Sequence, residues 1–448
     1  MTGAIAAIAT GGAPGGIGIV RVRGPAAFSI AKEIFRPKNR LDWESVKGYR
    51  MAYGEVEGID EAICLLFRGP GSYTGEDVAE FQCHGGPLLL RQVLRAALDA
   101  GARMAGPGEF TRRAWLNGRI KLSQAEAVMR LITAQSEQGL RAAHAGLGGA
   151  LEERIGHIRG GLVALAAHIA AWMDYPEEDI LPLRGGEAQG VLGEAEAALA
   201  GLIERSGGAQ AVLEGVSAAL IGRPNVGKSS LLNRLAGYER AIVAELPGTT
   251  RDTVTETVQL GNLTLRLTDT AGLRDTGHPV EKAGVERSLA AMRGADLVLA
   301  VLDAAEGVTG EDRALLDQCD LGRTIVVVNK IDLIASGRPE AIPCNYVVHT
   351  SAVTGEGLDE LSRAAESICR TAGFAPGEAM LATQRQAQCA SDARAAVREA
   401  LAALEAGFAP DAVSVCLEDA VQALFALTGE RAGDAVADEV FRGFCVGK

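Results

Sequence analysis

The stretch GRPNVGKS at residues 222–229 matches the pattern GxxxxGK(S/T) and decides how the middle of this chain folds. It follows the apolar run AALIG at 218–222 and precedes the helix-like run SLLNRLAG at 230–237. In this setting the glycines let backbone N–H groups wrap a phosphate, Lys228 reaches the terminal phosphates, and the Ser229 hydroxyl ligates Mg²⁺. The stretch therefore predicts a phosphate-binding loop between a strand and a helix of an α/β domain.

Two downstream motifs end apolar strands of the same domain. DTAG at 269–272 closes the run LTLRLTD, which places a carboxylate beside the metal and a glycine N–H toward the γ-phosphate. NKID at 329–332 closes the run TIVVVN, and Asp332 can accept two hydrogen bonds from the guanine edge, for which adenine has no matching donors. Hydrogen bonds to charged groups contribute about 1.5–3 kcal/mol each, so the motif predicts a strong preference for guanine.

The remaining parts of the predicted guanine-nucleotide site lie between and after these motifs. Thr250, within GTTRD at 248–252, is suited to close over Mg²⁺, and Ser351-Ala352 supplies the loop behind the base. The predicted GTP-binding residues are Asn225, Val226, Gly227, Lys228, Ser229, Ser230, Ala244, Glu245, Leu246, Pro247, Gly248, Thr249, Thr250, Asp269, Thr270, Ala271, Gly272, Asn329, Lys330, Asp332, Ser351 and Ala352.

The group that activates water for hydrolysis is less evident from the residues. Ras-like GTPases place Gln directly after DTAG, but here Leu273 stands in that position and cannot orient water. Glu281, nine residues after Gly272, can orient or deprotonate water through a second water; alternatively it is a solvated glutamate at a helix start. No residue stands out as an arginine finger, and a monovalent cation held by Asn225 can supply that charge.

The pattern of the chain changes three times, which predicts a multidomain protein of the α+β and α/β classes. We expect an α+β domain at 1–118, a helical domain at 119–215, an inserted Ras-like P-loop α/β domain at 216–375, and a return to the helical domain at 376–448. Short runs such as AIAAIAT, GIGIVRVRG and EAICLLF predict strands, and Gly261-Asn262 predicts a two-residue hairpin. One helical seam is predicted by the residues Leu151, Ile155, Ile158, Leu162, Leu165, Ile169 and Trp172.

Composition sets outer limits on the function. The 448 residues suggest about three domains, and the net charge of −13 excludes a generally basic protein that coats nucleic acid, so an RNA partner needs a local basic patch. The most apolar helix-like stretch, 162–172, is well short of the ~20 residues of a membrane span. The eight cysteines form no CxxC pair and the histidines no metal-ligand pair, so we expect reduced thiols in a cytoplasmic protein.

Outside the GTPase motifs, several stretches resemble the MnmE (TrmE) family of GTPases, which modify the wobble uridine of certain tRNAs. They are SYTGEDVAEFQCHGGP at 72–87, PGEFTRRAWLNGRIKLSQAEA at 107–127, the helical flanks with DYPEED, and the terminal FCVGK. The resemblance covers essentially the whole chain. It implies an N-terminal tetrahydrofolate-binding and dimerisation domain at 1–118, a homodimer, and a bound K⁺ that replaces the arginine finger. It assigns K⁺ to Asn225, Thr249 and the carbonyls of Ala244 and Leu246, and the catalytic glutamate to Glu281.

The resemblance also assigns residues outside the GTPase domain. A 5,10-methylene or 5-formyl tetrahydrofolate is expected at Arg21, Glu80, Arg119 and Lys448, with Arg119 replacing the lysine common in the family. Cys445 is associated with the modification reaction, as nucleophile or proton donor, or else is a packing thiol. His84 is either catalytic or a hydrogen-bonded structural histidine, and the DYPEED carboxylates fit a solvated helix break.

The predicted function is a K⁺-dependent GTPase that acts with the FAD-dependent partner MnmG. Together they are expected to add a carboxymethylaminomethyl or aminomethyl group to C5 of uridine 34 of certain tRNAs, with carbon from methylene-tetrahydrofolate. One rival is a GTP-regulated switch or ribosome-assembly factor without modification chemistry. Another is a GTP-driven scaffold whose N-terminal domain only dimerises and binds no folate.

Overall fold

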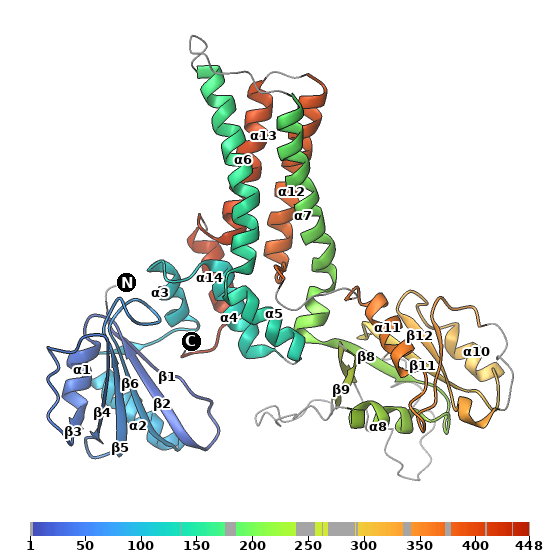
Figure 1. The fold of residues 1–448 in the computed structure, drawn as a ribbon. Coiled ribbons are helices and arrows are strands. Elements are labelled where there is room, and N and C mark those ends of the chain that lie inside the picture. Colours follow the sequence, from blue (N-terminus) through green and yellow to red (C-terminus); the bar gives the residue numbers. More distant parts are fainter. Residues whose placement is uncertain are drawn as a thin grey trace. The chain divides into compact units, whose positions relative to one another are not determined.

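The computed structural model describes residues 3–134, 136–174, 185–238, 256–261, 263–267, 292, 294–334, 342–371, 378–407, 410–431 and 433–447. The chain divides into two compact units (Figure 1). One joins residues 1–129 to the C-terminal residues 425–448, and the other comprises residues 130–424. The four domain ranges given above remain a proposed division.

The first unit is built on a seven-stranded sheet in the order β3-β4-β5-β6-β2-β1-β7, antiparallel except where β1 runs parallel to β7. Its core lies between the sheet and the two helices α1 and α2, because alternate strand residues such as Val20 and Val22 are fully buried. The strands are β1 Ile5–Ile8, β2 Gly15–Arg23, β3 Phe35–Pro37, β4 Tyr49–Val56, β5 Asp60–Phe67, β6 Val78–Gly85 and β7 Arg103–Met104; the helices are α1 Ala27–Ile34, α2 Pro87–Asp99, α3 Glu109–Leu116, α4 Leu122–Thr133 and α14 Asp434–Arg442.

The C-terminal helix α14 and the residues after it pack onto α3 and α4. Phe441 and Phe444 share a buried cluster with Leu122 of α4, and Phe441 lies 6.2 Å from the ring of Trp115 at the end of α3. Gly429, just after α13, has φ +76°, and a Cβ there would lie 2.2 Å from Leu122 Cβ. This packing carries the last residues of the chain to the N-terminal sheet.

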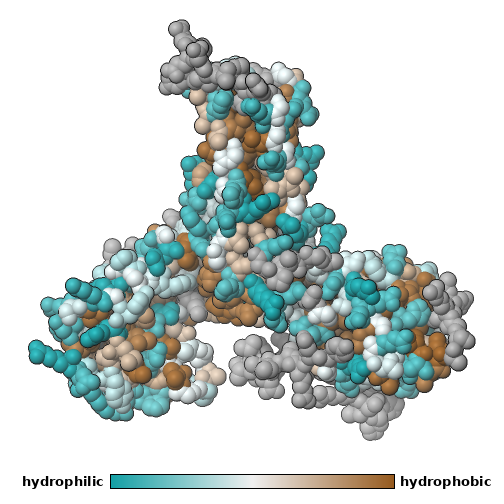
Figure 2. All heavy atoms as spheres, in the orientation of Figure 1, coloured by the Kyte–Doolittle hydropathy of each residue, from teal (hydrophilic) through white to brown (hydrophobic). Residues whose placement is uncertain are grey.

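The second unit combines long helices with an α/β domain inserted between α7 and α12. Both α6 and α12 pack against α7, and Figure 2 shows hydrophobic residues gathered along the middle of this helical part. The helices are α5 Glu137–Leu147, α6 Ala150–Asp174, α7 Gly185–Glu214, α12 Gln384–Glu405 and α13 Pro410–Thr428, whose last residues, from Phe425, belong to the first unit. The predicted seam is buried from Leu151 to Ile169, but Trp172 is 36% exposed because it lies in the last turn of α6, beyond the packed part of the helix.

The inserted domain is a six-stranded sheet in the order β13-β12-β11-β8-β10-β9. Its strands are parallel except β9, which pairs antiparallel with β10 and brings Leu260 opposite Leu263, as the two-residue hairpin predicts. Its elements are β8 Val216–Ile221, α8 Lys228–Tyr238, β9 Glu256–Leu260, β10 Leu263–Leu267, β11 Leu297–Asp303, α10 Gly310–Leu316, β12 Thr324–Asn329, the 3₁₀ helix η2 Ile331–Leu333, β13 Val347–His349 and α11 Leu358–Ile368.

All eight cysteines are free thiols. Among the described residues, no helix has both the length and the apolar character that crossing a membrane requires.

Candidate functional sites in the inserted domain and the N-terminal unit

The GRPNVGKS loop connects β8 to α8, and its path depends on two glycines. Gly222 has φ +145°, and a Cβ there would lie 2.3 Å from the carbonyl oxygen of Val301. Gly227 has φ +96°, and a Cβ there would lie 2.3 Å from Nδ2 of Asn329. A side chain at either position would collide with a neighbouring strand end, so the motif's glycines are sterically required.

Lys228, the first residue of α8, directs its ammonium group back into this loop. Its Nζ donates to the carbonyl oxygens of Gly222 (2.7 Å) and Arg223 (2.6 Å). Burial lowers the pKa of Lys228 from its usual value. A cation encircled by its own loop at a helix N-terminus is a site built for an anion such as a phosphate chain.

The end of β12 fastens the same loop from the other side. Asn329, fully buried, donates from Nδ2 to the carbonyl oxygen of Val226 (3.0 Å) and accepts from the backbone N–H of Ala352 (3.0 Å). Lys330, at φ +66°, donates to the carbonyl oxygen of Asn225 (2.7 Å), which itself has φ +65°. The phosphate loop and the predicted base-binding loops are therefore joined by direct hydrogen bonds.

Asp303, at the end of β11, belongs to this arrangement, although the sequence analysis did not single it out. Its Oδ2 accepts from Lys330 Nζ (2.6 Å) and its Oδ1 from the N–H of Ala305 (2.9 Å). Burial raises the pKa of Asp303, but the hydrogen bonds from Lys330 and the backbone outweigh it and hold the pKa below its usual value. The signal that could have identified it in the sequence is a carboxylate at the end of a buried strand, the same pattern that DTAG and NKID show.

The predicted guanine-reading carboxylate lies on η2, directly after β12. Asp332 is exposed, and the hydroxyl of Ser351 donates to its Oδ1 at 2.5 Å. Ser351 is buried, and its Oγ accepts from the N–H of Thr354 (3.1 Å). The structure thus brings the NKID and Ser-Ala motifs together with one carboxylate held at a fixed position.

Several predicted residues lie outside the part of the chain that the structure describes. Ser229 and Ser230 are described and stand in the first turn of α8. Those outside are Ala244, Glu245, Leu246, Pro247, Gly248, Thr249, Thr250, Asp269, Thr270, Ala271, Gly272, Glu281 and Lys448.

In the N-terminal unit, two of the predicted folate residues are direct cross-strand partners. Arg21 of β2 stands opposite Glu80 of β6, and its Nε lies 2.7 Å from Glu80 Oε1. Its guanidinium lies over the ring of Phe110, 5.4 Å from the centroid, and its Nη1 donates to the carbonyl oxygen of Gly447 at 3.4 Å. One arginine therefore contacts the sheet, α3 and the C-terminal tail.

The tail is seated by backbone contacts just before its end. Val446 forms an isolated bridge with Pro107, and the carbonyl oxygen of Cys445 accepts from the N–H of Gly108 (3.2 Å). Gly447 has φ +101°, and a Cβ there would lie 2.4 Å from the carbonyl oxygen of Ile8. The thiol-bearing residue Cys445 is exposed, so the tail is bound along its backbone while this residue faces solvent.

Arg119 lies at the loop formed by residues 72–76. A Cβ at Gly75 would lie 3.3 Å from Arg119 Cγ, which places the arginine stem directly over that glycine. From the same loop, Tyr73 donates to Thr111 of α3 at 3.1 Å. The loop thus links Arg119 to the helix that carries Phe110 beneath Arg21.

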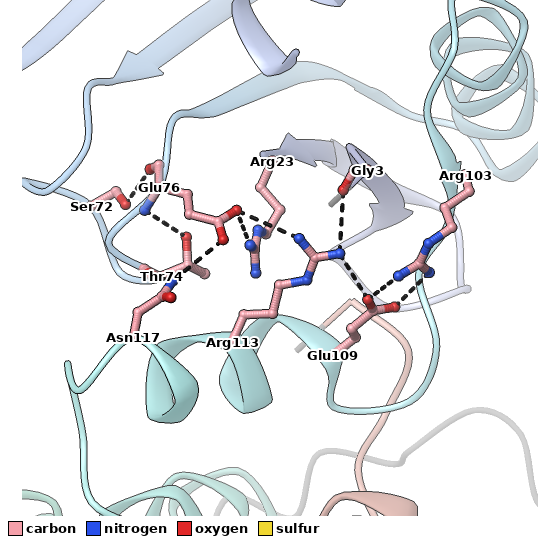
Figure 3. Close-up of polar contacts among 9 residues, drawn as sticks. All are labelled: Gly3, Arg23, Ser72, Thr74, Glu76, Arg103, Glu109, Arg113 and Asn117. Atoms are coloured by element: carbon pink, nitrogen blue, oxygen red, sulfur yellow. Dashed lines mark hydrogen bonds and ion pairs between the residues drawn. The ribbon is translucent and has the colours of Figure 1, made fainter. Parts of the chain in front are cut away.

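Next to Arg21 lies a partly buried ionic network that sequence reasoning missed (Figure 3), in which the Arg103 side chain is 50% exposed and that of Arg23 is fully buried. Arg23 and Arg113 both pair with Glu76, and Arg113 and Arg103 both pair with Glu109. Burial lowers the pKa of Arg23 to about 10 despite its pairing with Glu76. Burial acts to raise the pKa of Glu109, but hydrogen bonds from Arg103, the backbone and Arg113 bring it down to about 2. The network ties β2, the 72–76 loop, β7 and α3 into one block.

The sheet face that carries Arg21 and Glu80 presents different kinds of side chain on different strands. On β4, Tyr49, Met51 and Tyr53 alternate outward and are 71%, 66% and 46% exposed. On β6, Glu80, Gln82 and His84 lie on one face because side chains repeat every two residues. The face therefore offers an aromatic and apolar side next to a row of polar groups.

Comparisons with known proteins show the family of this chain. Residues 4–119 match the family model described as "GTP-binding protein TrmE N-terminus", and residues 122–445 match that of the MnmE helical domain. A tRNA modification GTPase MnmE of Symbiobacterium thermophilum is 48% identical over 99% of both chains, and that of Thermus thermophilus is 44% identical over 99% of both. Among solved structures, the G domain of the FeoB iron transporter of T. maritima is 32% identical and covers 34% of this chain and 98% of its own, with a TM-score of 0.25. On the two family models and the full-length relatives, this chain belongs to the MnmE family of tRNA modification GTPases.

Proposed function

We propose that this GTPase is a cytoplasmic, homodimeric enzyme that works with the flavoprotein MnmG on the wobble uridine of certain tRNAs. The reaction adds a carboxymethylaminomethyl or aminomethyl group to C5 of uridine 34, with the carbon drawn from methylene-tetrahydrofolate. GTP hydrolysis in the inserted domain orders the modification centre rather than performing its chemistry. Cys445 serves that centre through its thiol.

The observation that carries the proposal is the meeting of three segments at Arg21. The guanidinium pairs with Glu80, stacks over Phe110 and contacts the tail carbonyl of Gly447. A reduced folate has a flat ring with N–H donors, which suits Glu80 with its carboxylate fixed by Arg21, and it has carboxylates at the opposite end, which suit the cation of Lys448. Arg119 at the 72–76 loop supplies a further cation on the same side of the unit.

A folate titration tests this proposal. Wild-type protein is expected to bind 5-formyl-tetrahydrofolate in a calorimetric titration. Gly447→Ala is expected to weaken that binding by about 10- to 100-fold, because a Cβ 2.4 Å from the Ile8 carbonyl displaces the tail and removes a charged contact. Gly443→Ala is the matched control, since a Cβ there meets nothing within 4 Å. Wild-type binding by Gly447→Ala would contradict the role of the tail, and no folate binding by the wild type would favour the GTP-regulated switch.

The homodimer is proposed to form through the open face of the N-terminal sheet. Tyr49 and Met51 are 71% and 66% exposed on neighbouring positions of one strand face, beside the T-shaped pair of Tyr49 with Phe67. A second copy covering this face would bury these side chains and enclose the polar row that begins at Arg21 and Glu80. A flat ligand on this face would then be bound between the surfaces of the two copies.

In the GTPase site, the described residues fit the proposed cations. Ser229 lies in the first turn of α8 beside the encircled ammonium of Lys228, the position from which a hydroxyl ligates Mg²⁺; Thr250 is proposed as its second ligand. Asn225 is exposed at the loop rim, with its backbone carbonyl fixed by Lys330. We propose that its side chain holds K⁺ together with Thr249 and the carbonyls of Ala244 and Leu246, and that Glu281 orients the attacking water.

The K⁺ site predicts a salt dependence of hydrolysis. GTP turnover by the wild type is expected to rise severalfold when Na⁺ is replaced by K⁺ at constant ionic strength, because a cation at Asn225 takes the place of an arginine finger. Steady-state phosphate release measures it. Asn225→Ala should make the two salts equivalent, whereas equal rates in both salts for the wild type would remove the cation from the mechanism.

A further inference from the structure

A histidine at the end of β6 is held by a buried carboxylate while its ring faces solvent. His84 Nδ1 lies 3.0 Å from both carboxylate oxygens of Asp60, and its backbone N–H donates to Asp60 Oδ2 at 2.9 Å. The side chain of Asp60 is 12% exposed, and that of His84 is 76% exposed. Two contacts from one residue thus fix the position of the ring relative to the sheet.

This pairing determines which ring nitrogen is available for chemistry. Burial acts to raise the pKa of Asp60, but the backbone and side-chain hydrogen bonds from His84 outweigh it and hold the pKa below its usual value. An ionised carboxylate only accepts hydrogen bonds, so Nδ1 carries the hydrogen and the lone pair of a neutral ring is on Nε2. The arrangement is that of a histidine base oriented by a carboxylate.

His84 extends the polar row of the proposed folate face. It lies four residues beyond Glu80 on the same strand, which puts it on the same face at about 13 Å along β6, given a rise of about 3.3 Å per residue. The carboxylates nearby are already engaged: Glu80 pairs with Arg21 at 2.7 Å, and Glu61 accepts from Lys38 at 2.6 Å and Tyr53 at 2.8 Å. These carboxylates already accept hydrogen bonds from cations or a hydroxyl, which makes them weaker proton acceptors. Nε2 of His84, by contrast, belongs to an exposed ring and can be reached by a substrate.

We propose that Nε2 of His84 is the proton acceptor for substitution at C5 of the target uridine, and that Asp60 is its positioning residue. This inference rests on the proposed function. When the methylene carbon of the carrier joins C5, the π electrons of the C5=C6 bond form the new C5–C bond, and one carbon–nitrogen bond between that carbon and the carrier breaks, its electron pair staying on the carrier nitrogen. The C5–H bond then breaks. The electron pair of the C5–H bond restores the C5=C6 double bond, and the proton passes to Nε2. The C5 proton must be removed whether the product carries a carboxymethylaminomethyl or an aminomethyl group. The base is therefore needed for both products.

The test compares His84→Ala, Asp60→Asn and the control His157→Ala, which changes an exposed histidine on α6. Full-length variants are assayed with MnmG, tRNA and methylene-tetrahydrofolate for modified uridine, and separately for GTP turnover and 5-formyl-tetrahydrofolate binding. His84→Ala is expected to lower the modification rate by about 10²-fold or more, as loss of a general base does. GTP turnover, which takes place in the inserted domain, is expected to stay within twofold, and His157→Ala is expected to match the wild type.

Added imidazole separates a chemical role from a structural one. The His84 side chain is 76% exposed, so free imidazole can reach the space left by His84→Ala and is expected to restore modification in proportion to its concentration. Asp60→Asn retains the ring but not its charged partner, so its rate should fall about tenfold without rescue. Unchanged modification by His84→Ala, or a loss that imidazole does not restore, overturns the proposal. Failure of the wild type to bind folate is a different result, which overturns the proposed function itself.

Discussion

Replacing Asp332 by asparagine is expected to convert the GTP site into one that prefers xanthosine nucleotides. The carboxylate accepts from two N–H donors on the guanine edge, and each such charged hydrogen bond contributes about 1.5–3 kcal/mol, so GTP affinity should fall by about 10²-fold or more. The asparagine amide instead pairs with the xanthine edge, which has a carbonyl where guanine has an amino group. Titrations of the wild type and of Asp332→Asn with GTP and with XTP measure this change in nucleotide preference.

The substitution is expected to change the base preference without disturbing the rest of the site, because other residues hold the surroundings of Asp332 in place. Ser351, buried and fixed by the N–H of Thr354, donates to Oδ1 at 2.5 Å and can donate equally to an amide oxygen. Asn329, which holds the phosphate loop, does not depend on Asp332. Asp317→Asn, at an exposed carboxylate elsewhere in the inserted domain, is the matched control. An unchanged preference in Asp332→Asn would remove this residue from base recognition.

The phosphate loop shows what spacing can and cannot predict. The GxxxxGK(S/T) pattern and its flanking runs predict β8, the loop and α8, because each is a local consequence of apolar periodicity and glycine placement. The bond from Asn329 to the carbonyl of Val226 joins residues 103 apart in sequence, and Lys330 bonds both Asn225 and Asp303. Such contacts depend on the order of strands in the sheet, which local patterns do not specify.

The N-terminal unit shows the same difference between what local sequence patterns predict and what depends on the arrangement of the strands. The runs AIAAIAT, GIGIVRVRG and EAICLLF correspond to β1, β2 and β5. The sequence analysis does not name β3, β4, β6 or β7, although Tyr49, Met51 and Tyr53 of β4 alternate with a period of two. The pairing of Arg21 with Glu80 follows from the register of β2 with β6. The family resemblance alone pointed to both residues, since by residue type each is an ordinary surface charge, and the register that pairs them depends on the fold.

The partly buried ionic network next to that site leads to a prediction about stability. It holds three guanidinium groups, those of Arg23, Arg103 and Arg113, and two carboxylates, those of Glu76 and Glu109. Arg23 is fully buried, and among the described residues its Nε and Nη1 have no hydrogen-bond partner. An unpaired buried charge destabilises the folded state. We therefore expect Glu76 to contribute much, and Arg23 little, to the free energy of unfolding.

Glu76→Gln is therefore expected to destabilise the N-terminal unit by about 3–5 kcal/mol, because Arg23 and Arg113 would then face each other without a carboxylate between them. Arg23→Met, by contrast, leaves two cations with two anions and an apolar chain in a buried space, so its stability should stay within about 1 kcal/mol of the wild type or exceed it. Hydrogen exchange of the β2 and α3 amides measures both changes, with α7 and α12 as internal references in the same chain. If Arg23→Met were as damaging as Glu76→Gln, Arg23 and Glu76 would contribute equally to stability, and the excess of positive charge would not be what governs this network.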